Sequence, residues 1–229
     1  MTGPQKDDYI NIHDHGASPQ KGVFTLENIM VHEDKYPEEK EGIGYSCGAH
    51  PWYLEEESIE AQIGKVRQYS SLPGVIALGE AGFDRLRGAE NSLQEKAFRA
   101  HVKISEEVKK PLFIHCVKGW DELLRCNKEM NPSMPWIIHG FRGKPGLAEQ
   151  LLEKGFFLSP WVEWAMGPNS VETLKSIPVN RLFLETDGFD ISIEQVYRAV
   201  AEHLGLEVQI LKEHLLENFN SCFRNLHTP

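Results

Sequence analysis

The stretch from residue 74 to residue 115 contains two short apolar segments separated by a longer amphipathic one. It begins with GVIALGE (74–80), continues through SLQEKAFRAHVKISEEVKK (92–110) and ends with PLFIH (111–115). The outer segments are rich in Val, Ile and Leu, as buried strands are, while the middle segment places apolar residues three and four positions apart. This order predicts a strand, a covering helix and a second strand parallel to the first.

The same alternation extends over the rest of the chain. Further strands are expected at 9–13, 23–29, 44–48, 135–140, 155–159 and 181–186, and further helices at 55–70, 119–130, 144–155, 169–177, 191–205 and 207–226. Eight strands, most of them followed by a helix, predict an α/β fold of the TIM (β/α)8 type. The length of 229 residues suits one such unit, so we expect a single domain over residues 1–229.

The connection between the first two expected strands is unusually short. It centres on residues 16–21, whereas a crossover between parallel strands needs about a dozen residues or more. We therefore expect a distorted barrel with an abbreviated first crossover. The second strand is then either a hairpin partner of the first or an irregular member of the barrel.

Composition narrows the class of protein. The chain carries a net charge of −10 and 41% apolar residues, which is typical of a soluble globular protein. No signal peptide, no run of 18 apolar residues and no paired cysteine motif is present, so we expect a cytosolic protein with reduced cysteines, no membrane contact and no obligatory protein partner. The negative charge disfavours wrapping of duplex nucleic acid, but bound cations would reverse the sign around a single phosphate.

Imidazoles and carboxylates follow the expected strands. Because the carboxyl ends of parallel barrel strands lie on one rim, these side chains are expected to face one another. Such a cluster is unfavourable without a cation, so it predicts a metal site. Six ligands exceed the need of one tetrahedral ion and suit two divalent ions that share a bridge. The six are His13, His15, Glu80, His115, His139 and Asp187.

All of these residues except Glu80 also have an ordinary structural explanation when each is taken alone. His13 and His15 suit a polar strand end, and Asp187 suits a helix N-cap. His115 and His139 each suit a hydrogen-bonded core histidine. Glu80 is harder to explain, since an unpaired buried carboxylate is costly. Their joint placement favours the metal site, with zinc, manganese, magnesium, iron and nickel all compatible with the ligands.

Six motifs support this interpretation. The segments IHDH, GAHPWY, GEAGFD, PLFIHC, IIHGFRG and FLETDG, in this order, resemble the TatD family of metal-dependent hydrolases, known as TatD-like deoxyribonucleases, from about Tyr9 to ENFNSCFRNL (217–226). The resemblance implies a distorted TIM barrel with two metal ions. It implies that His13, His15, Glu80 and Asp187 hold the first ion. It also implies that Glu80, His115 and His139 hold the second, so that Glu80 bridges.

The resemblance further implies hydrolysis of phosphodiesters at DNA ends or in short oligonucleotides. Asp187 and Glu80 would be the catalytic residues, with Asp187 orienting the attacking water and accepting its proton. Asp84 and Glu185 are candidates for positioning the ligands. Substrate contacts are expected from His50, Lys118, Arg142 and Trp161.

Two other functions remain open at this point. The same two ions would also serve the hydrolysis of another ester or an amide, including a small phosphate ester or an aminoacyl link. A non-catalytic barrel that only binds metal is the second alternative. Departures from the family pattern after His115 and after Asp187, where GFD replaces the usual proline, lie in the regions that contact substrate.

Overall fold

The computed structural model describes residues 3–33 and 35–223, and these divide into two compact units. Unit 1 consists of the described parts of Met1–Glu27, Lys40–Gly44 and Ile137–Pro229. Unit 2 consists of the described parts of Asn28–Glu39 and Tyr45–Trp136. Single-domain organisation over residues 1–229 stays a prediction.

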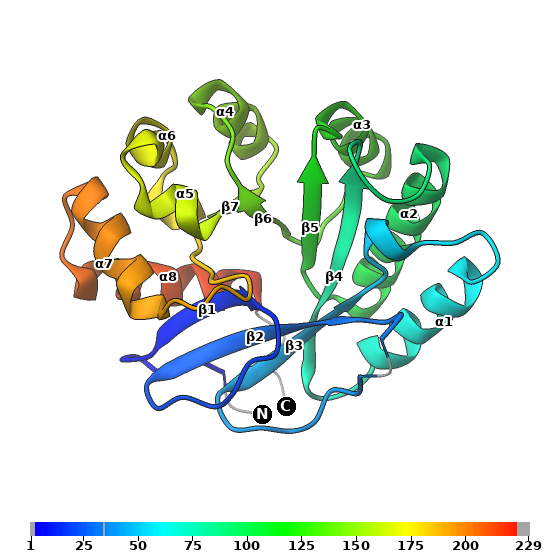
Figure 1. Cartoon of the computed structure of the whole chain (residues 1–229), viewed down its shortest axis with the longest axis horizontal. Helices are drawn as coiled ribbons and strands as arrows, with labels where there is room; N and C mark the ends of the chain where they lie inside the picture. The colour runs from blue at the N-terminus through cyan, green and yellow to red at the C-terminus, as the bar shows by residue number, and fades with distance from the viewer. Residues whose placement is uncertain (1–2, 34, 224–229) are drawn as a thin grey trace. The chain divides into compact units, whose positions relative to one another are not determined.

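Within the described ranges, seven strands form one sheet in the order of the sequence (Figure 1). The pairs β1–β2, β3–β4, β4–β5 and β6–β7 all run parallel. Parallel strands in sequential order, with helices between most of them, confirm the predicted α/β fold of the distorted TIM-barrel type. The strands are β1 (Tyr9–Asp14), β2 (Val23–Met30), β3 (Ile43–Gly48), β4 (Val75–Asp84), β5 (Leu112–Val117), β6 (Trp136–Phe141) and β7 (Phe157–Pro160).

Unit 2 contains the predicted strand–helix–strand unit, with α2 (Asn91–Val108) between β4 and β5. Phe98 of α2 packs between Phe83 and Trp136, with ring centroids 5.1 and 5.2 Å apart, which holds the helix against the sheet. Figure 1 shows α1, α2 and α3 beside these strands. The other elements are the short 3-10 helix η1 (Pro51–Tyr53), α1 (Ile59–Ser70) and α3 (Trp120–Met130).

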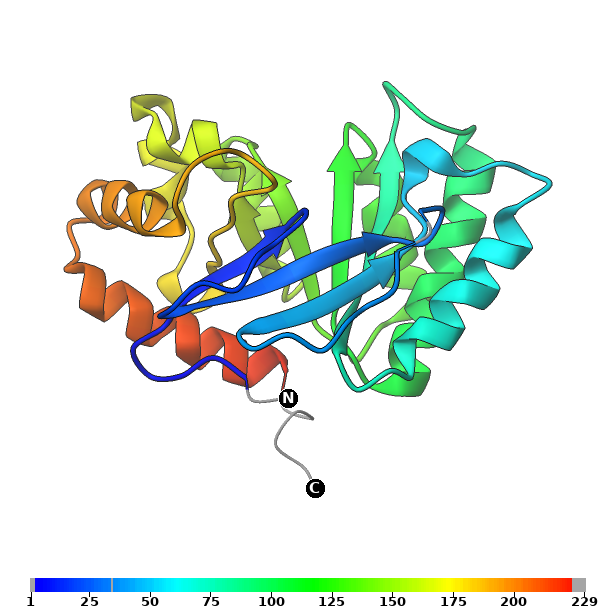
Figure 2. The same cartoon turned by 60° about the horizontal axis from the view of Figure 1, so that its bottom comes forward.

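Unit 1 packs its last two helices against its first two strands. Figure 2 shows α8, drawn in red, beside the blue strand β1. Tyr197 of α7 bonds through its hydroxyl to both the N–H and the carbonyl of Ile10, and Phe219 of α8 contacts Phe24, with ring centroids 5.3 Å apart. Gly205 follows the last residue of α7, and its φ of 69° is that of a left-handed C-cap. The helices are α4 (Pro145–Glu153), α5 (Val162–Met166), α6 (Val171–Ser176), α7 (Ile193–Leu204) and α8 (Val208–Cys222), with 3-10 turns η2 (Pro168–Ser170) and η3 (Val179–Arg181).

The helix expected over 207–226 is confirmed as α8 up to Cys222, and residues 224–226 lie outside the described residues. The short helix α5 was not expected. None of the helices in the described ranges has the length and hydropathy needed to cross a membrane.

The prediction of an eighth strand at 181–186 is wrong. Leu182 makes a single parallel bridge to Leu158, and Leu184 accepts one hydrogen bond from the N–H of Ile12. The side-chain amide of Asn218 donates hydrogen bonds to the carbonyls of Val179 and Leu182, both with a donor–acceptor distance of 2.8 Å. The segment therefore touches strands on both sides without forming a continuous ladder, because a helix side chain satisfies part of its backbone.

The first crossover is abbreviated, as predicted, and β2 is parallel to β1, so the hairpin alternative is wrong. The second crossover lacks a helix as well: in residues 31–42, apart from Asp34, which is not described, the structure contains turns and irregular chain. Each connection ends in a tight turn, closed by the bridges Gln20–Val23 and Lys40–Ile43.

Candidate metal centre

The predicted ligands lie inside or just after the strands rather than at their last residues. Strand β4 continues four residues past Glu80 to Asp84, and β5 and β6 each continue two residues past His115 and His139. Gly79 permits this course, because with its φ of 102° a Cβ there would lie 2.2 Å from the carbonyl oxygen of Phe113. The close approach of the two strands fixes the backbone at Glu80.

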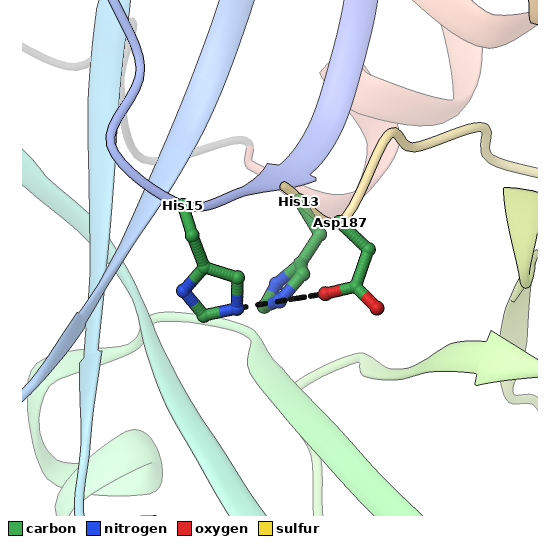
Figure 3. A group of neighbouring side chains, drawn as sticks. All are labelled: His13, His15 and Asp187. Carbon is green, nitrogen blue, oxygen red and sulfur yellow. Dashed lines mark ion pairs between the residues drawn. The ribbon is translucent and has the colours of Figure 1, made fainter. Parts of the chain in front are cut away.

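In unit 1, His13, His15 and Asp187 converge on one point (Figure 3). Oδ1 of Asp187 lies 3.6 Å from Nε2 of His13 and 3.5 Å from Nε2 of His15. The Asp187 N–H donates to the carbonyl of His13, and Asp14 accepts from the N–H groups of His15 and Gly188. These backbone bonds hold the loop after residue 184 against the end of β1, so two imidazoles and one carboxylate face each other.

His139 and Glu185 extend this group. The His139 ring stacks on His13 with 4.3 Å between centroids, and its Nδ1 lies 3.7 Å from Oε1 of Glu185. Glu185 is fully buried; Oε1 accepts from the Gly140 N–H, and Oε2 has no hydrogen-bond partner among the described residues. A buried carboxylate oxygen in that position is costly unless a cation neutralises it. His139, Glu185 and Asp187 offer donor atoms within 4.8 Å of one another.

In unit 2, Glu80, His50 and His115 form a second buried group. Oε1 of Glu80 lies 3.4 Å from both Nε2 of His50 and Nδ1 of His115. Oε2 of Glu80 accepts a 3.0 Å hydrogen bond from Asn28, whose side-chain oxygen in turn accepts from the Glu80 N–H and from Ser46. The sequence interpretation did not include Asn28. The signal was a polar residue in the otherwise largely apolar strand VFTLENIM.

Asp84 and Trp52 set the orientation of His115. Oδ2 of Asp84 lies 3.0 Å from Nε2 of His115 and accepts a 2.7 Å bond from the Trp52 indole N–H. Burial disfavours the charged form of Asp84, but these two bonds and one from the Leu86 N–H outweigh it and hold the pKa of this carboxyl well below its usual range. An ionised Asp84 holds the proton of His115 on Nε2, which leaves the Nδ1 lone pair facing Glu80.

His50 faces Glu80 with Nε2, whereas His115 faces it with Nδ1. Nδ1 of His50 accepts a 3.2 Å hydrogen bond from the Trp52 N–H, so the neutral ring carries its proton on Nε2. That N–H faces Glu80. His115 therefore offers an electron pair to a cation, while His50 offers a proton to an oxygen.

The other predicted substrate contacts lie outside both groups of donors. Lys118 is exposed in the turn after β5. The Arg142 guanidinium lies over the Trp161 ring at 4.6 Å, and Trp161 contacts Phe189 with 6.0 Å between centroids. Arg142, Trp161 and Phe189 thus form one aromatic and cationic cluster in unit 1.

Comparison with known proteins identifies the family. Residues 23–224 match the family model described as TatD related DNase. The chain belongs to the TatD-related DNase family.

Two relatives of this TatD-family chain show how similar its members are. An uncharacterized metal-dependent hydrolase from Buchnera aphidicola is 36% identical over 62% of this chain and 54% of its own length. A protein from Erwinia billingiae, named 3'-5' ssDNA/RNA exonuclease TatD, is 31% identical over 62% of this chain and 56% of its own. The match therefore spans a little over half the length of these curated relatives.

A solved structure of a TatD homologue from Escherichia coli has the same fold. It superposes with a TM-score of 0.79 and is 20% identical in sequence. The superposition covers 98% of this chain and 100% of the other. This likeness confirms the fold of the TatD-family chain.

The donors fit divalent metal ions. Unit 1 offers three imidazoles with two carboxylates, and unit 2 offers the His115 imidazole with the Glu80 carboxylate, most of them buried; such mixed sets suit zinc, manganese, iron or nickel. His115 has its distal nitrogen bonded to Asp84, which is how metal-binding histidines are commonly held. The chain therefore has a candidate His/Glu/Asp metal centre in each unit.

Proposed function

We propose that the chain is a metal-dependent phosphodiesterase that hydrolyses nucleic-acid ends or short oligonucleotides with two divalent ions. The observation that carries this proposal is the pair of imidazole–carboxylate groups, one in each unit, with His13, His15 and Asp187 in unit 1 and Glu80 and His115 in unit 2. The exonuclease name of the Erwinia relative supports the substrate class. Glu80 as bridge and His139 as ligand of the second ion stay predictions of the family resemblance.

Divalent ions at these residues would acidify a water molecule and neutralise charge on a phosphate oxygen. Asp187 then has the position of a proton acceptor, because its carboxylate is partly exposed and Oδ1 already faces two imidazoles. Its loop is fixed to β1 by the bond to the His13 carbonyl, so the carboxylate keeps one orientation. A fixed base loses little entropy when it accepts the proton of the attacking water.

His50 is assigned to the substrate. Its Nε2–H faces into the unit 2 group, and a phosphate oxygen accepts such a bond. Lys118 and Arg142 are exposed cations suited to the backbone phosphates of a short strand. Contacts from so few cations suit a strand end on an acidic protein better than a long duplex.

A substrate panel tests the proposal. Single-stranded DNA, a short RNA, p-nitrophenyl phosphate diesters and carboxylic esters would be incubated with protein loaded with zinc, manganese or magnesium. We expect cleavage of the nucleic acids, and severe loss of turnover in Asp187→Asn with unchanged circular dichroism. Asp190→Asn, an exposed neighbour, is the matched control.

The panel also separates the alternatives. Hydrolysis of carboxylic or small phosphate esters without nucleic-acid cleavage would assign the chain to another ester hydrolase. Stable metal binding without turnover of any substrate would assign it to the non-catalytic class. The expected cytosolic location stays a prediction.

A further inference from the structure

Unit 2 contains a cavity next to its candidate metal centre. The cavity has a volume of about 690 Å³ and lies between the end of β2, the η1 turn, α1 and the loop before α2. This volume falls in the range of small-molecule pockets, about 300–1,000 Å³. Of the residues that line it, Trp52 also contacts His115 in the candidate metal centre of unit 2.

Aromatic rings form one side of the cavity. His32 stacks on Tyr53 with 4.0 Å between centroids and 22° between planes, and Trp52 follows directly in the chain. The Arg87 guanidinium, in the loop before α2, lies 3.9 Å from the centre of the Trp52 ring. Rings of this kind bind planar ligands by stacking, a contact that tolerates different ring substituents.

The wall of the cavity is pre-formed. Gly88 packs so closely on the η1 turn that a Cβ would lie 2.4 Å from the Pro51 carbonyl oxygen, and the same oxygen accepts from the Ala89 N–H at 3.2 Å. The loop before α2 is thereby fixed to the turn that carries Trp52 and Tyr53. A fixed wall binds a ring without the cost of ordering a loop.

Gln62 supplies a polar group. Its side-chain nitrogen donates to the Tyr53 carbonyl at 2.9 Å and to the Ser58 hydroxyl at 3.0 Å, which fixes the amide. The residue is 7% exposed, lines the cavity, and its Oε1 has no hydrogen-bond partner among the described residues. An occupant with a ring N–H or amino group would give this oxygen the donor that it lacks.

Trp52 connects the cavity to the metal centre. Its ring lines the cavity, while its centroid lies 4.8 Å from that of His50 and 5.4 Å from that of His115. A ligand with a flat ring in the cavity and a phosphate at His50 would reach across this one side chain. Nucleotides have this combination of groups.

We propose that this cavity binds a nucleobase, and that it is the subsite that holds a base of the substrate beside the metal centre. The base lies among Trp52, Tyr53 and His32 and donates an N–H to Oε1 of Gln62. The inference rests on the proposed function for the phosphate, whereas ring binding depends on the cavity alone.

Calorimetric titration of the metal-loaded protein tests the subsite without turnover. Adenosine 5'-monophosphate and ribose 5-phosphate share the phosphate and differ in the base. We expect the nucleotide to bind about tenfold more tightly, as stacking of one base commonly provides. His32→Ala removes part of the aromatic wall, and Ala61→Trp fills the cavity from the exposed side of α1. Both should reduce nucleotide affinity about tenfold and leave ribose 5-phosphate unchanged.

Gln68→Trp is the matched control, because Gln68 is exposed on α1 two turns beyond Ala61 and does not line the cavity. Equal affinity for the two ligands, no binding of the nucleotide, or unchanged nucleotide binding in both folded variants would overturn the subsite. If the nucleotide preference holds and depends on these residues while the substrate panel shows no nucleic-acid cleavage, the subsite stands and the proposed phosphodiesterase activity fails.

Discussion

Nε2 of His115 lies 3.0 Å from Oδ2 of Asp84, and this one contact decides which nitrogen of the ring is available to a metal ion. With the proton held on Nε2, Nδ1 turns toward Glu80 as an electron-pair donor. The ligand property of His115 therefore depends on a carboxylate 31 residues earlier in the sequence.

Replacement of Asp84 tests this relationship. Asp84→Asn keeps the shape of the side chain but removes the charge that orients His115, so we expect metal affinity to fall roughly 10–100-fold with the fold retained. Zinc binding would be measured by competition with a chromophoric chelator. Asp121→Asn changes an exposed carboxylate of α3 and serves as the control. Equal affinity in the two variants would mean that Asp84 does not position the ligand.

Removal of both histidines near the end of β1 addresses the number of ions. In the double variant His13→Ala/His15→Ala, unit 1 loses two of the three imidazoles near Asp187, while His115 and Glu80 of unit 2 are unchanged. We expect about one of two metal equivalents to be lost. Elemental analysis after equilibrium dialysis gives the count. Retention of both equivalents with unaltered affinity would rule out this assignment.

His101 predicts how stability depends on pH. Its Nε2 accepts a 3.0 Å bond from the Ala49 N–H, its Nδ1 lies 2.7 Å from the Ala97 carbonyl, and complete burial lowers its pKa from 6.5 to about 4. Between these values the unfolded chain binds a proton that the folded chain does not. The stability that depends on a neutral His101 is therefore fully present above the unfolded pKa. The free energy of unfolding decreases by ~3 kcal/mol as pH falls to the folded pKa.

Urea unfolding at about pH 7.5 and about pH 4.5 measures this difference. His101→Gln offers an amide in place of the ring and has no titratable group. We expect this variant to be less stable near neutral pH and to show a smaller loss on acidification. Parallel pH profiles for the two proteins would contradict the prediction.

We expect the hydrogen bonds of Asn218 to stabilise the irregular segment at 181–186 and the turn before it. Asn218→Ala would leave the carbonyls of Val179 and Leu182 without their side-chain donor. We expect a loss of ~1–3 kcal/mol, visible as a lower thermal midpoint. Gln209→Ala removes an exposed hydrogen bond on the same helix and should change stability by less than about 0.5 kcal/mol. Similar midpoints for the two variants would show that Asn218 is dispensable.

Local patterns predicted much of the fold. The strand–helix–strand stretch of residues 74–115 was predictable because the hydrophobic periodicities of strands and helices differ and can be recognised within a short stretch of sequence. The segment RLFLET (181–186) has the composition of a strand, yet Asn218, more than thirty residues later, takes part of its backbone. Composition does not report such a distant competitor for hydrogen bonds.

The same limit applies to the site. The types and order of the six predicted ligands were visible in the sequence, and the structure gathers His13, His15, His139 and Asp187 in unit 1 and Glu80 and His115 in unit 2. Asn28 was missed because its role depends on facing Glu80 across strands. The proton positions of His50 and His115 depend on Trp52 and Asp84, and no pattern of residue types states them.

The division of unit 1 between early and late parts of the chain has a consequence for its synthesis. Tyr9 and Phe24 pack on Tyr197 and Phe219, so β1 and β2 leave the ribosome long before their partners exist. At about 5–20 residues per second, this interval lasts on the order of ten seconds or more. During that time the two apolar strands lack their covering helices, and we expect this nascent chain to be most prone to aggregation before α8 emerges.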